Sequence, residues 1–382
     1  MIRTPPLWKT MTVALGHDWL TGMRGGERVL ELLCKAFPTA PLYTLLYNRA
    51  AVSEIIQRHP IVTSWLQHLP QISRYYRYAL PLFPHAVGSL RTKPADLLIT
   101  TSHCAIKGLH MPPGTRHLSY CFTPMRYAWV FYGEYFGRNP LKKQVLKPIL
   151  RWLREWDLRT CEQVDYFVTL SRHVQDRIRT CYQREADVVY PPVNTEYWTP
   201  ATGLPETSLE GLSGGTFDLI VSALVPYKRI DLAVKAYTRL NRPLVIVGTG
   251  TEHTSLRRLA GSSIRFAGWR QDPQIRELYR HCRALIFPGE EDFGIVPVEA
   301  QACGRPVVAY GKGGVTETVI EGQTGLFFQE QTEEALIHAI ERVPQHAWNP
   351  TLIRTHAERF GAQAFIDGLA GCVDRCLAGQ RK

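Results

Sequence analysis

The sequence predicts an α/β protein made of two Rossmann-like domains in tandem. The chain has 382 residues, more than a single hydrophobic core usually supports. Short apolar runs alternate with helical patterns, which is typical of parallel sheets. This alternation occurs twice, on either side of a polar, turn-rich stretch at 200–216. We therefore expect a first domain over 1–192, completed by a returning helix at about 358–382, and a second domain over 193–357.

The first series of apolar runs begins close to the amino terminus. Each run is followed by a polar or Gly/Pro-containing segment and then by a helical stretch, as in strand–loop–helix units. A glycine-rich loop after the first run leads into a helical pattern over 28–37. The strands expected in this half are 12–15, 96–101, 116–121, 165–170 and 188–190.

The second series repeats this organisation with shorter spacings. The expected strands are 218–223, 243–247, 264–267, 284–288, 306–309 and 326–328, and the expected helices are 231–240, 255–260, 273–282 and 296–303. Ligands of open parallel sheets bind outside the carboxyl ends of the strands. Polar residues on the loops that follow the strands are therefore the first residues to consider for a site.

The composition is that of a globular protein. Hydrophobic residues make up 45% and charged residues 21%, and no apolar run approaches the ~20 residues of a membrane-spanning helix. The opening segment 1–11 contains Pro5 and Pro6 and has the pattern of neither a signal peptide nor an anchor. Nine scattered cysteines without a Cys-x-x-Cys pair favour reduced thiols, so we expect a cytoplasmic protein.

The positive charge is concentrated in one half of the chain. The net charge is +11; the first half, up to Pro192, is basic and the rest is slightly acidic. An Arg/Tyr cluster at 74–78 and a basic run stand out, the latter made of Lys142, Lys143, Lys147, Arg151 and Arg154. These stretches suit an anionic membrane surface or a phosphorylated substrate, with a solvated face as the alternative. No nucleic-acid-binding module accompanies them, so nucleic acid is not expected as a partner.

Two carboxylates follow the strand expected at 284–288. Glu291 lies on the loop, and Glu299 lies one to two turns into the next helix. The first could hold sugar hydroxyls and the second could accept hydrogen bonds from both hydroxyls of a ribose. Gly294, near the helix start, would let backbone N–H groups approach a phosphate. The alternative is an acidic surface loop before an ordinary amphipathic helix.

Basic and glycine-containing loops surround these carboxylates in the sequence. Lys228 and Arg229, shortly after Ser222, could neutralise a diphosphate, although a solvated basic turn is the alternative. The turn Gly248-Thr249-Gly250 leaves space for a base or a phosphate. It is not a complete Gly-x-Gly-x-x-Gly fingerprint because His253 occupies the third glycine position.

The ordered set of these motifs closely resembles family 4 glycosyltransferases, which are retaining enzymes of the GT-B fold. The motifs are Ser222 with Pro226-Tyr227-Lys228-Arg229, Gly248-x-Gly250, Glu291-x7-Glu299, Gly304-Arg305-Pro306 and Gly313-Gly314. The resemblance implies two Rossmann-like domains facing across a cleft. It is nearest to bacterial mannosyltransferase-type members that build surface polysaccharides.

The resemblance also implies roles for individual residues. Glu291 would contact the transferred sugar near the reacting carbon, Glu299 would hold the ribose, and Lys228 and Arg229 would hold the diphosphate. The full set expected to bind the donor is Gly25, Gly26, Ser222, Lys228, Arg229, Gly248, Gly250, Phe293, Gly294, Ile295 and Glu299.

The first domain should supply the acceptor side of the site. Gly25 and Gly26 open a helix after the first strand, where backbone N–H groups can meet a phosphate, or simply form a helix-entry turn. His17 and Asp18 end the first strand and could face the acceptor. His103 ends another strand and could exchange protons near neutral pH, so we include it with Glu291 and Lys228 among the catalytic candidates.

The chain departs from the family pattern at two positions. Many relatives carry histidine where this chain has Phe122, and many carry arginine where it has Ala223. Arg229 could replace the missing cation, and His103 or Arg126 could take over on the acceptor side. Retention needs no strong external base if the leaving diphosphate draws the acceptor proton itself. No Asp-x-Asp motif or His/Cys ligand cluster is present, so no metal and no other cofactor is expected.

The function expected from the sequence is transfer of a hexosyl, for example mannosyl, group from a nucleotide diphosphate sugar such as GDP-mannose. The acceptor would be a hydroxyl of a lipid-linked molecule or a polysaccharide, with peripheral contact to the inner face of an anionic membrane. A non-catalytic relative that binds nucleotide sugar or glycan is the main alternative, motivated by Phe122 and Ala223. A nicotinamide-dependent oxidoreductase is a distant third, because the glycine fingerprint is incomplete.

Overall fold

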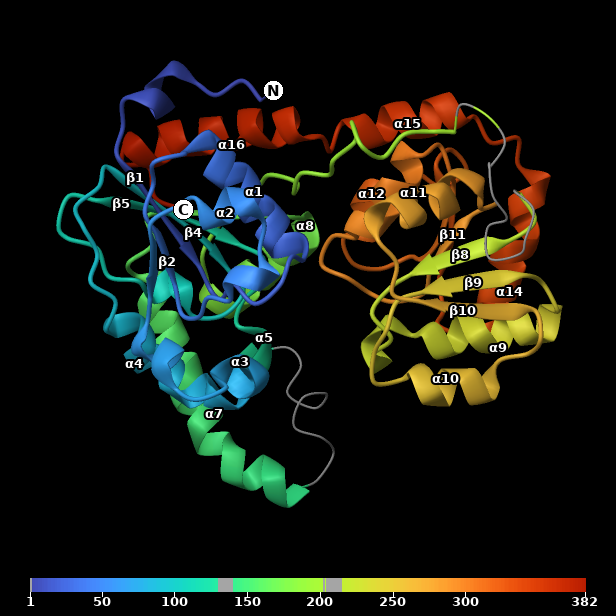
Figure 1. The fold of residues 1–382 in the computed structure, drawn as a ribbon, viewed down its shortest axis with the longest axis horizontal. Helices are drawn as coiled ribbons and strands as arrows, with labels where there is room; N and C mark the ends of the chain where they lie inside the picture. Colours follow the sequence, from blue (N-terminus) through green and yellow to red (C-terminus); the bar gives the residue numbers. More distant parts are fainter. Residues whose placement is uncertain (1, 130–139, 202, 204–214) are drawn as a thin grey trace. The chain divides into compact units, whose positions relative to one another are not determined.

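The computed structural model describes residues 2–129, 140–201, 203 and 215–382 (Figure 1). Within 140–146 the side chains are described only at position 144, so Lys142 and Lys143 of the basic run lie outside the described side chains. The chain forms two compact units. The first comprises Met1–Pro192 with Gln363–Lys382, and the second comprises Val193–Ala362.

A seven-stranded parallel sheet forms the centre of the first unit, in the order β3-β2-β1-β4-β5-β6-β7. The strands are β1 (Val13–His17), β2 (Leu42–Thr44), β3 (Ile61–Thr63), β4 (Leu97–Ser102), β5 (Arg116–Cys121), β6 (Tyr166–Thr169) and β7 (Asp187–Val188). In the register of the central pair, Val13 lies opposite Leu97 and His17 opposite Thr101. All residues of β1 and β4 are buried, because helices cover both faces of a parallel sheet.

Most helices of the first unit lie between these strands along the chain, whereas η1 precedes β1 and α16 follows the second unit. They are η1 (Pro6–Lys9), α1 (Gly25–Ala36), η2 (Arg49–Ala51), α2 (Glu54–Gln57), η3 (Trp65–His68), α3 (Ile72–Tyr75), η4 (Tyr76–Leu82), α4 (Phe83–Gly88), η5 (Ile106–Gly108), α5 (Arg126–Trp129), α7 (Pro140–Cys161), α8 (Arg172–Tyr182) and α16 (Ala362–Leu377). Helix α1 begins three residues before the pattern at 28–37, because the Glu27 carboxylate accepts the Arg24 N–H at 3.1 Å and caps the first turn.

The carboxyl-terminal helix returns to the first unit, as expected from the sequence (Figure 1, red). Its buried residues are Phe365, Ile366, Leu369, Cys372, Val373 and Cys376, which form one apolar stripe at helical spacing. The Phe365 ring lies edge-on to Tyr120 of β5, with 5.6 Å between centroids. Through this stripe α16, the last helix of the chain, packs on the core of the first unit.

The second unit is built on a six-stranded parallel sheet, in the order β10-β9-β8-β11-β12-β13. Its strands are β8 (Asp218–Val221), β9 (Leu244–Val247), β10 (Ile264–Gly268), β11 (Leu285–Phe287), β12 (Val307–Tyr310) and β13 (Gly325–Phe328). Its helices are η6 (Pro226–Lys228), α9 (Ile230–Leu240), α10 (His253–Leu259), α11 (Asp272–His281), α12 (Ile295–Ala302), α13 (Val315–Thr318), α14 (Glu333–Arg342), η7 (Val343–Gln345) and α15 (Pro350–Glu358). Two Rossmann-like α/β units, expected from the sequence, are thereby confirmed.

The described part of the chain contains no helix that is long and apolar enough to cross a membrane. All nine cysteines are free, and eight of them are buried.

Candidate functional site

The expected donor residues of the second unit gather where β8, β9 and β11 end. These strands are neighbours in the parallel sheet, so the loops after them meet at one edge. Lys228 lies in η6 after β8, and Glu291 lies on the loop between β11 and α12. The two side chains form an ion pair, Lys228 Nζ to Glu291 Oε1, and are 15% and 25% exposed. A cation and a carboxylate expected to bind different parts of one donor therefore contact each other directly.

The two side chains of the ion pair line a narrow cavity at the ends of β8 and β11. The cavity measures about 10 Å³, roughly the space of one water molecule. Its lining includes Ser222, Lys228, Gly289 and Glu291.

Glycines fix the loop that carries Glu291. A Cβ on Gly289 would lie 2.9 Å from the Lys228 Cα, and a Cβ on Gly313 or Gly314 would overlap the backbone oxygen of Glu291 or Asp292. The Gly314 N–H donates to the Glu291 carbonyl at 2.8 Å. The Glu291 loop is thus held between the η6 turn and the loop after β12, and only glycine permits this spacing.

Helix α12 follows the Glu291 loop and carries Glu299. Gly294 precedes the helix with a φ of +93°, a conformation that favours glycine. The Phe293 ring packs against Phe360, with 5.7 Å between centroids. Glu299 accepts a hydrogen bond from the Tyr279 hydroxyl at 3.0 Å, and it is only partly buried. Tyr279 was not expected from the sequence, because nothing in the spacing of the two residues links α11 to α12.

Arg229 is held beside the ion pair by two partners. Its Nε contacts the Asp231 carboxylate at 3.2 Å, and its Nη1 donates to Gln331 Oε1 at 3.1 Å. The Gln331 side chain in turn donates to the carbonyl of Pro288 at 3.0 Å. The guanidinium is therefore oriented by α9 and by the loop after β13, a restraint that the sequence did not indicate.

The glycines after β9 lie against the backbone that follows β8. A Cβ on Gly248 would overlap the Ser222 carbonyl, and a Cβ on Gly250 would overlap the Leu224 carbonyl. The Leu224 N–H donates to the Thr249 carbonyl at 3.0 Å. The space that the missing side chains leave is filled by the backbone after β8. These glycines therefore allow close contact between the two loops, and their part in donor binding stays a prediction.

In the first unit, the expected residues gather at the ends of β1, β4 and β5. A Cβ on Gly26 would lie 3.2 Å from the Phe122 ring and 3.5 Å from the His17 ring, so both rings pack against the start of α1. His17 Nδ1 lies 2.7 Å from the Thr101 hydroxyl. Burial lowers the pKa of His17 to about 4, although Asp18 favours its charged form. His17 is consequently neutral near pH 7.

Asp18 anchors a loop and does not face an acceptor. It is fully buried, and its two oxygens accept the backbone N–H groups of residues 103 to 106 at 2.7 to 2.9 Å. With its lone pairs engaged by the protein, the carboxylate has no position left for a substrate hydroxyl. The expectation that Asp18 contacts the acceptor is therefore wrong; it shapes the loop that carries His103.

His103 lies in this loop with a partly exposed side chain. Its Nδ1 is 3.2 Å from Asp18, the side chain is 28% exposed, and the ring meets Trp19 edge-on with 4.5 Å between centroids. Burial lowers the pKa of His103; the Asp18 carboxylate opposes this shift, and the charges of Arg126, Arg24 and Arg77 add to it. A neutral, oriented imidazole can accept a proton. Arg126 opens α5 and is close enough to act on His103 electrostatically.

Within the described part of the chain, no group of three or more His, Cys, Asp or Glu side chains is arranged to hold a metal ion.

The family match to known proteins falls within the second unit. Residues 213–361 match the family described as glycosyl transferases group 1. The D-inositol 3-phosphate glycosyltransferase of Acidothermus cellulolyticus is 33% identical over 230 residues, which cover 54% of this chain and 50% of that protein. A GDP-mannose-dependent alpha-(1-6)-phosphatidylinositol monomannoside mannosyltransferase of Mycolicibacterium smegmatis is 29% identical over 204 residues, covering 48% and 53%. The matched region thus spans about half the length of these relatives.

Solved structures match over nearly the whole chain. The Anabaena protein HepE in complex with UDP has a TM-score of 0.68 at 17% identity, covering 95% of this chain and all of that one. WaaG, a glycosyltransferase involved in lipopolysaccharide biosynthesis, has a TM-score of 0.62 at 18% identity, covering 93% and 95%. Residues 213–361 of the second unit therefore match the group 1 glycosyl transferases, and the two units have the GT-B fold of these solved structures.

Proposed function

We propose that this protein transfers a hexosyl group, with mannosyl as the first choice, from a nucleotide diphosphate sugar to a hydroxyl of a lipid-linked or polysaccharide acceptor, with retention. The observation that carries the proposal is the contact of Lys228 with Glu291 at the ends of β8 and β11. Lys228, proposed to bind the diphosphate, and Glu291, proposed to bind the sugar, are therefore close enough to contact a single donor molecule. The mannosyl choice is supported by the relative named for GDP-mannose.

In this mechanism the donor separates the ion pair. Lys228 and Arg229 take the diphosphate, and the start of α12 adds its backbone N–H groups. Glu291 is left facing the sugar, and Glu299, oriented by Tyr279, accepts the ribose hydroxyls. As the bond to the diphosphate breaks, the acceptor hydroxyl attacks on the same face and its proton passes to the leaving oxygen. We expect no metal requirement, because these groups balance the charge that develops.

A nucleotide-release assay tests the proposal. Purified protein is incubated with GDP-mannose or UDP-glucose, and free GDP or UDP is measured over time with and without EDTA. Slow release in water supports an enzyme and names the base. Tight binding without release over hours would favour the alternative, a non-catalytic binder of nucleotide sugar, which Phe122 and Ala223 motivate.

We further propose that the first unit contacts an anionic membrane through its segment from η3 to η4. Several large apolar or aromatic side chains are exposed there: Trp65 (39%), Tyr75 (39%), Tyr78 (88%) and Leu82 (41%). Arg74 and Arg77 are exposed between them. Aromatic rings favour the headgroup region, and cations favour anionic lipid. A cytoplasmic protein with such a segment would work on the inner face of the membrane.

Vesicle co-sedimentation tests this contact. The wild-type protein should sediment with vesicles that contain phosphatidylglycerol and remain free with pure phosphatidylcholine. Charge reversal of Arg74 and Arg77 to Glu should abolish sedimentation. Reversal of Arg257 and Arg258, an exposed pair on α10 of the second unit, serves as the matched control. Equal binding by both double variants would contradict the assignment.

A further inference from the structure

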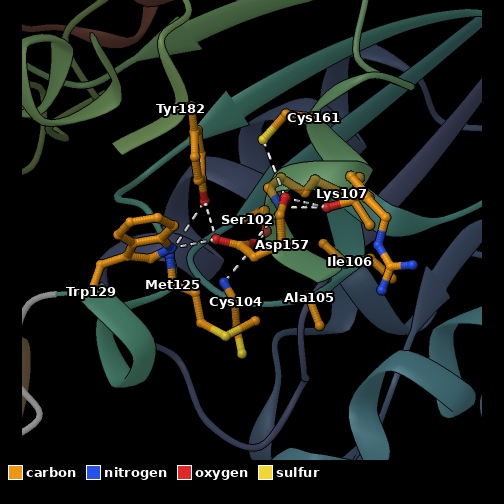
Figure 2. Close-up of polar contacts among 12 residues, drawn as sticks. Ser102, Cys104, Ala105, Ile106, Lys107, Met125, Trp129, Asp157, Cys161 and Tyr182 are labelled. Atoms are coloured by element: carbon orange, nitrogen blue, oxygen red, sulfur yellow. Dashed lines mark hydrogen bonds and ion pairs between the residues drawn. The ribbon is translucent and has the colours of Figure 1, made fainter. Parts of the chain in front are cut away.

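A buried ion pair in the first unit lies outside the donor residues and has no role in the mechanism above. Lys107 of η5 and Asp157 of α7 are 1% and 0% exposed at their side chains. The Lys107 ammonium donates to Asp157 Oδ1, to the Asp157 backbone carbonyl at 2.9 Å and to the Thr160 hydroxyl at 2.6 Å. All three of its N–H bonds are therefore used, as Figure 2 shows for its contact with Asp157.

The second oxygen of the same carboxylate binds two aromatic side chains. Asp157 Oδ2 accepts the Trp129 indole N–H at 2.8 Å and the Tyr182 hydroxyl at 2.9 Å (Figure 2). One carboxylate thus joins η5, α5 and α8 to the helix that carries it. The Lys107 ammonium also lies 5.1 Å from the Tyr182 ring centroid, so the network is compact.

Both ends of this network adjoin residues of the acceptor side. Lys107 directly follows the loop 103–106, which includes His103 and is bound by Asp18. Trp129 ends α5, which begins at Arg126, and the Met125 N–H approaches the Tyr182 hydroxyl at 3.4 Å. Arg154, one turn before Asp157, donates to the Ala128 carbonyl at 2.6 Å. The segments of His103 and Arg126 are therefore both fixed to the same stretch of α7.

Stability alone is a weak reason for such a pair. Removing two charges from water costs about as much as their attraction returns, and apolar side chains of similar size often serve as well. Burial opposes the charge on Lys107, but Asp157 outweighs it and raises the pKa of Lys107. Hydrogen bonds that use all three N–H groups of Lys107 and both oxygens of Asp157 do, however, fix orientation.

We propose that Asp157 is a positioning residue of the acceptor side, which sets His103, through Lys107, and Arg126, through Trp129, in one arrangement. It touches no substrate itself. The inference rests on the proposed transferase function for its effect on rate, but the arrangement can be measured separately.

The first test removes single hydrogen bonds to Asp157. Trp129→Phe and Tyr182→Phe each delete one donor to Oδ2 and keep a ring in place. We expect transfer to fall about tenfold or more with a raised acceptor KM, since small displacements of positioned groups are costly. The donor KM and GDP or UDP affinity should stay within about twofold, because Lys228, Arg229 and Glu299, which are proposed to hold the nucleotide, lie in the second unit. Tyr166→Phe is the control: it deletes another tyrosine–aspartate bond of the first unit, to Asp187 at 2.5 Å.

The second test replaces the pair by apolar side chains and uses a readout that needs no activity. The double variant Lys107→Met/Asp157→Leu should fold, as judged by circular dichroism. The His103 ring signals, assigned by comparison with His103→Gln, should shift in its NMR spectrum and titrate at a different pH from the wild type. Unchanged His103 signals together with wild-type transfer would overturn the inference. A wild-type protein that transfers no sugar would instead contradict the proposed function, while the His103 signals would still decide the arrangement.

Discussion

Lys228 and Glu291 contact each other across the ends of β8 and β11, although they are expected to bind different parts of a donor. The pair is only partly buried, so separating it exposes no uncompensated charge to a dry interior. A diphosphate would offer Lys228 a second anion at short range, and a sugar would offer Glu291 hydroxyl donors. The ion pair thus keeps both side chains in position, and contacts with the donor can replace it when the donor binds.

Glu291→Ala should abolish transfer while leaving nucleoside diphosphate affinity within about tenfold, or 1.4 kcal/mol. The ion pair with Lys228 also predicts in which direction the affinity for the nucleotide changes. Removal of the carboxylate frees Lys228, so Glu291→Gln should bind GDP or UDP more tightly than the wild type. Isothermal titration calorimetry and a release assay measure the two quantities. Glu290→Gln, at the exposed neighbouring position, is the control. Turnover at the wild-type level in Glu291→Ala would remove Glu291 from its role.

Lys228→Ala should weaken binding of nucleoside diphosphates far more than binding of the nucleoside. The loss should be about tenfold or more, because a charge-assisted hydrogen bond contributes about 1.5–3 kcal/mol. The unpaired Glu291 carboxylate would then also repel phosphate. Lys235→Ala provides a control, since that exposed lysine pairs with Glu333 on the surface of the same unit at 3.8 Å. Equal losses for nucleoside and nucleoside diphosphate would refute the contact.

The positions of most strands and of the donor loops could be predicted because they depend on patterns within the chain. Apolar runs and helical spacing place Glu291 after β11 and Glu299 within α12 without any tertiary information. Strands β2 and β3, of three residues each, were missed. They lie beyond β1 in the sheet and so do not alter the site.

The roles of Asp18 and Gly248 could not be predicted, because partners distant in sequence decide them. A carboxylate at a strand end that binds substrate looks the same in sequence as one that binds a loop 85 residues away. A glycine that admits a ligand likewise looks the same as one that admits the Ser222 carbonyl. The family resemblance could not separate these cases either, since both depend on packing at one position.

Gly313→Ala should destabilise the second unit and reduce transfer more than Gly322→Ala does. Both glycines have a positive φ, +81° and +73°, so alanine is strained at either position by about 1–2 kcal/mol. A Cβ on Gly322 meets nothing within 4 Å, whereas one on Gly313 would overlap the Glu291 carbonyl. The comparison isolates the displacement of the Glu291 loop. Urea unfolding measures the stability of each variant, and the release assay measures its activity. Equal losses in the two variants would contradict the prediction.

The first unit should lose stability as the pH falls from about 7 to 5. Burial lowers the pKa of His17 and of His117 to about 4, against 6.5 in an unfolded chain. Between pH 6.5 and pH 4 the two histidines bind protons in the unfolded chain but not in the folded protein. The free energy of unfolding therefore decreases as the pH falls. Each histidine should contribute about 2 kcal/mol over this range. Well above pH 6.5 each histidine is neutral in both the folded and the unfolded protein, so its contribution to stability is fully retained.

A substitution separates this effect from general acid unfolding. In His117→Gln the amide can still meet the Thr100 hydroxyl, which lies 2.9 Å from the native ring, but it takes up no proton. Its urea midpoint should therefore change less between pH 7 and pH 5 than that of the wild type. His110→Gln, at an exposed position of the same unit, should retain the full pH dependence. If all three proteins lost stability equally, carboxylates rather than buried histidines would govern the acid sensitivity of this unit.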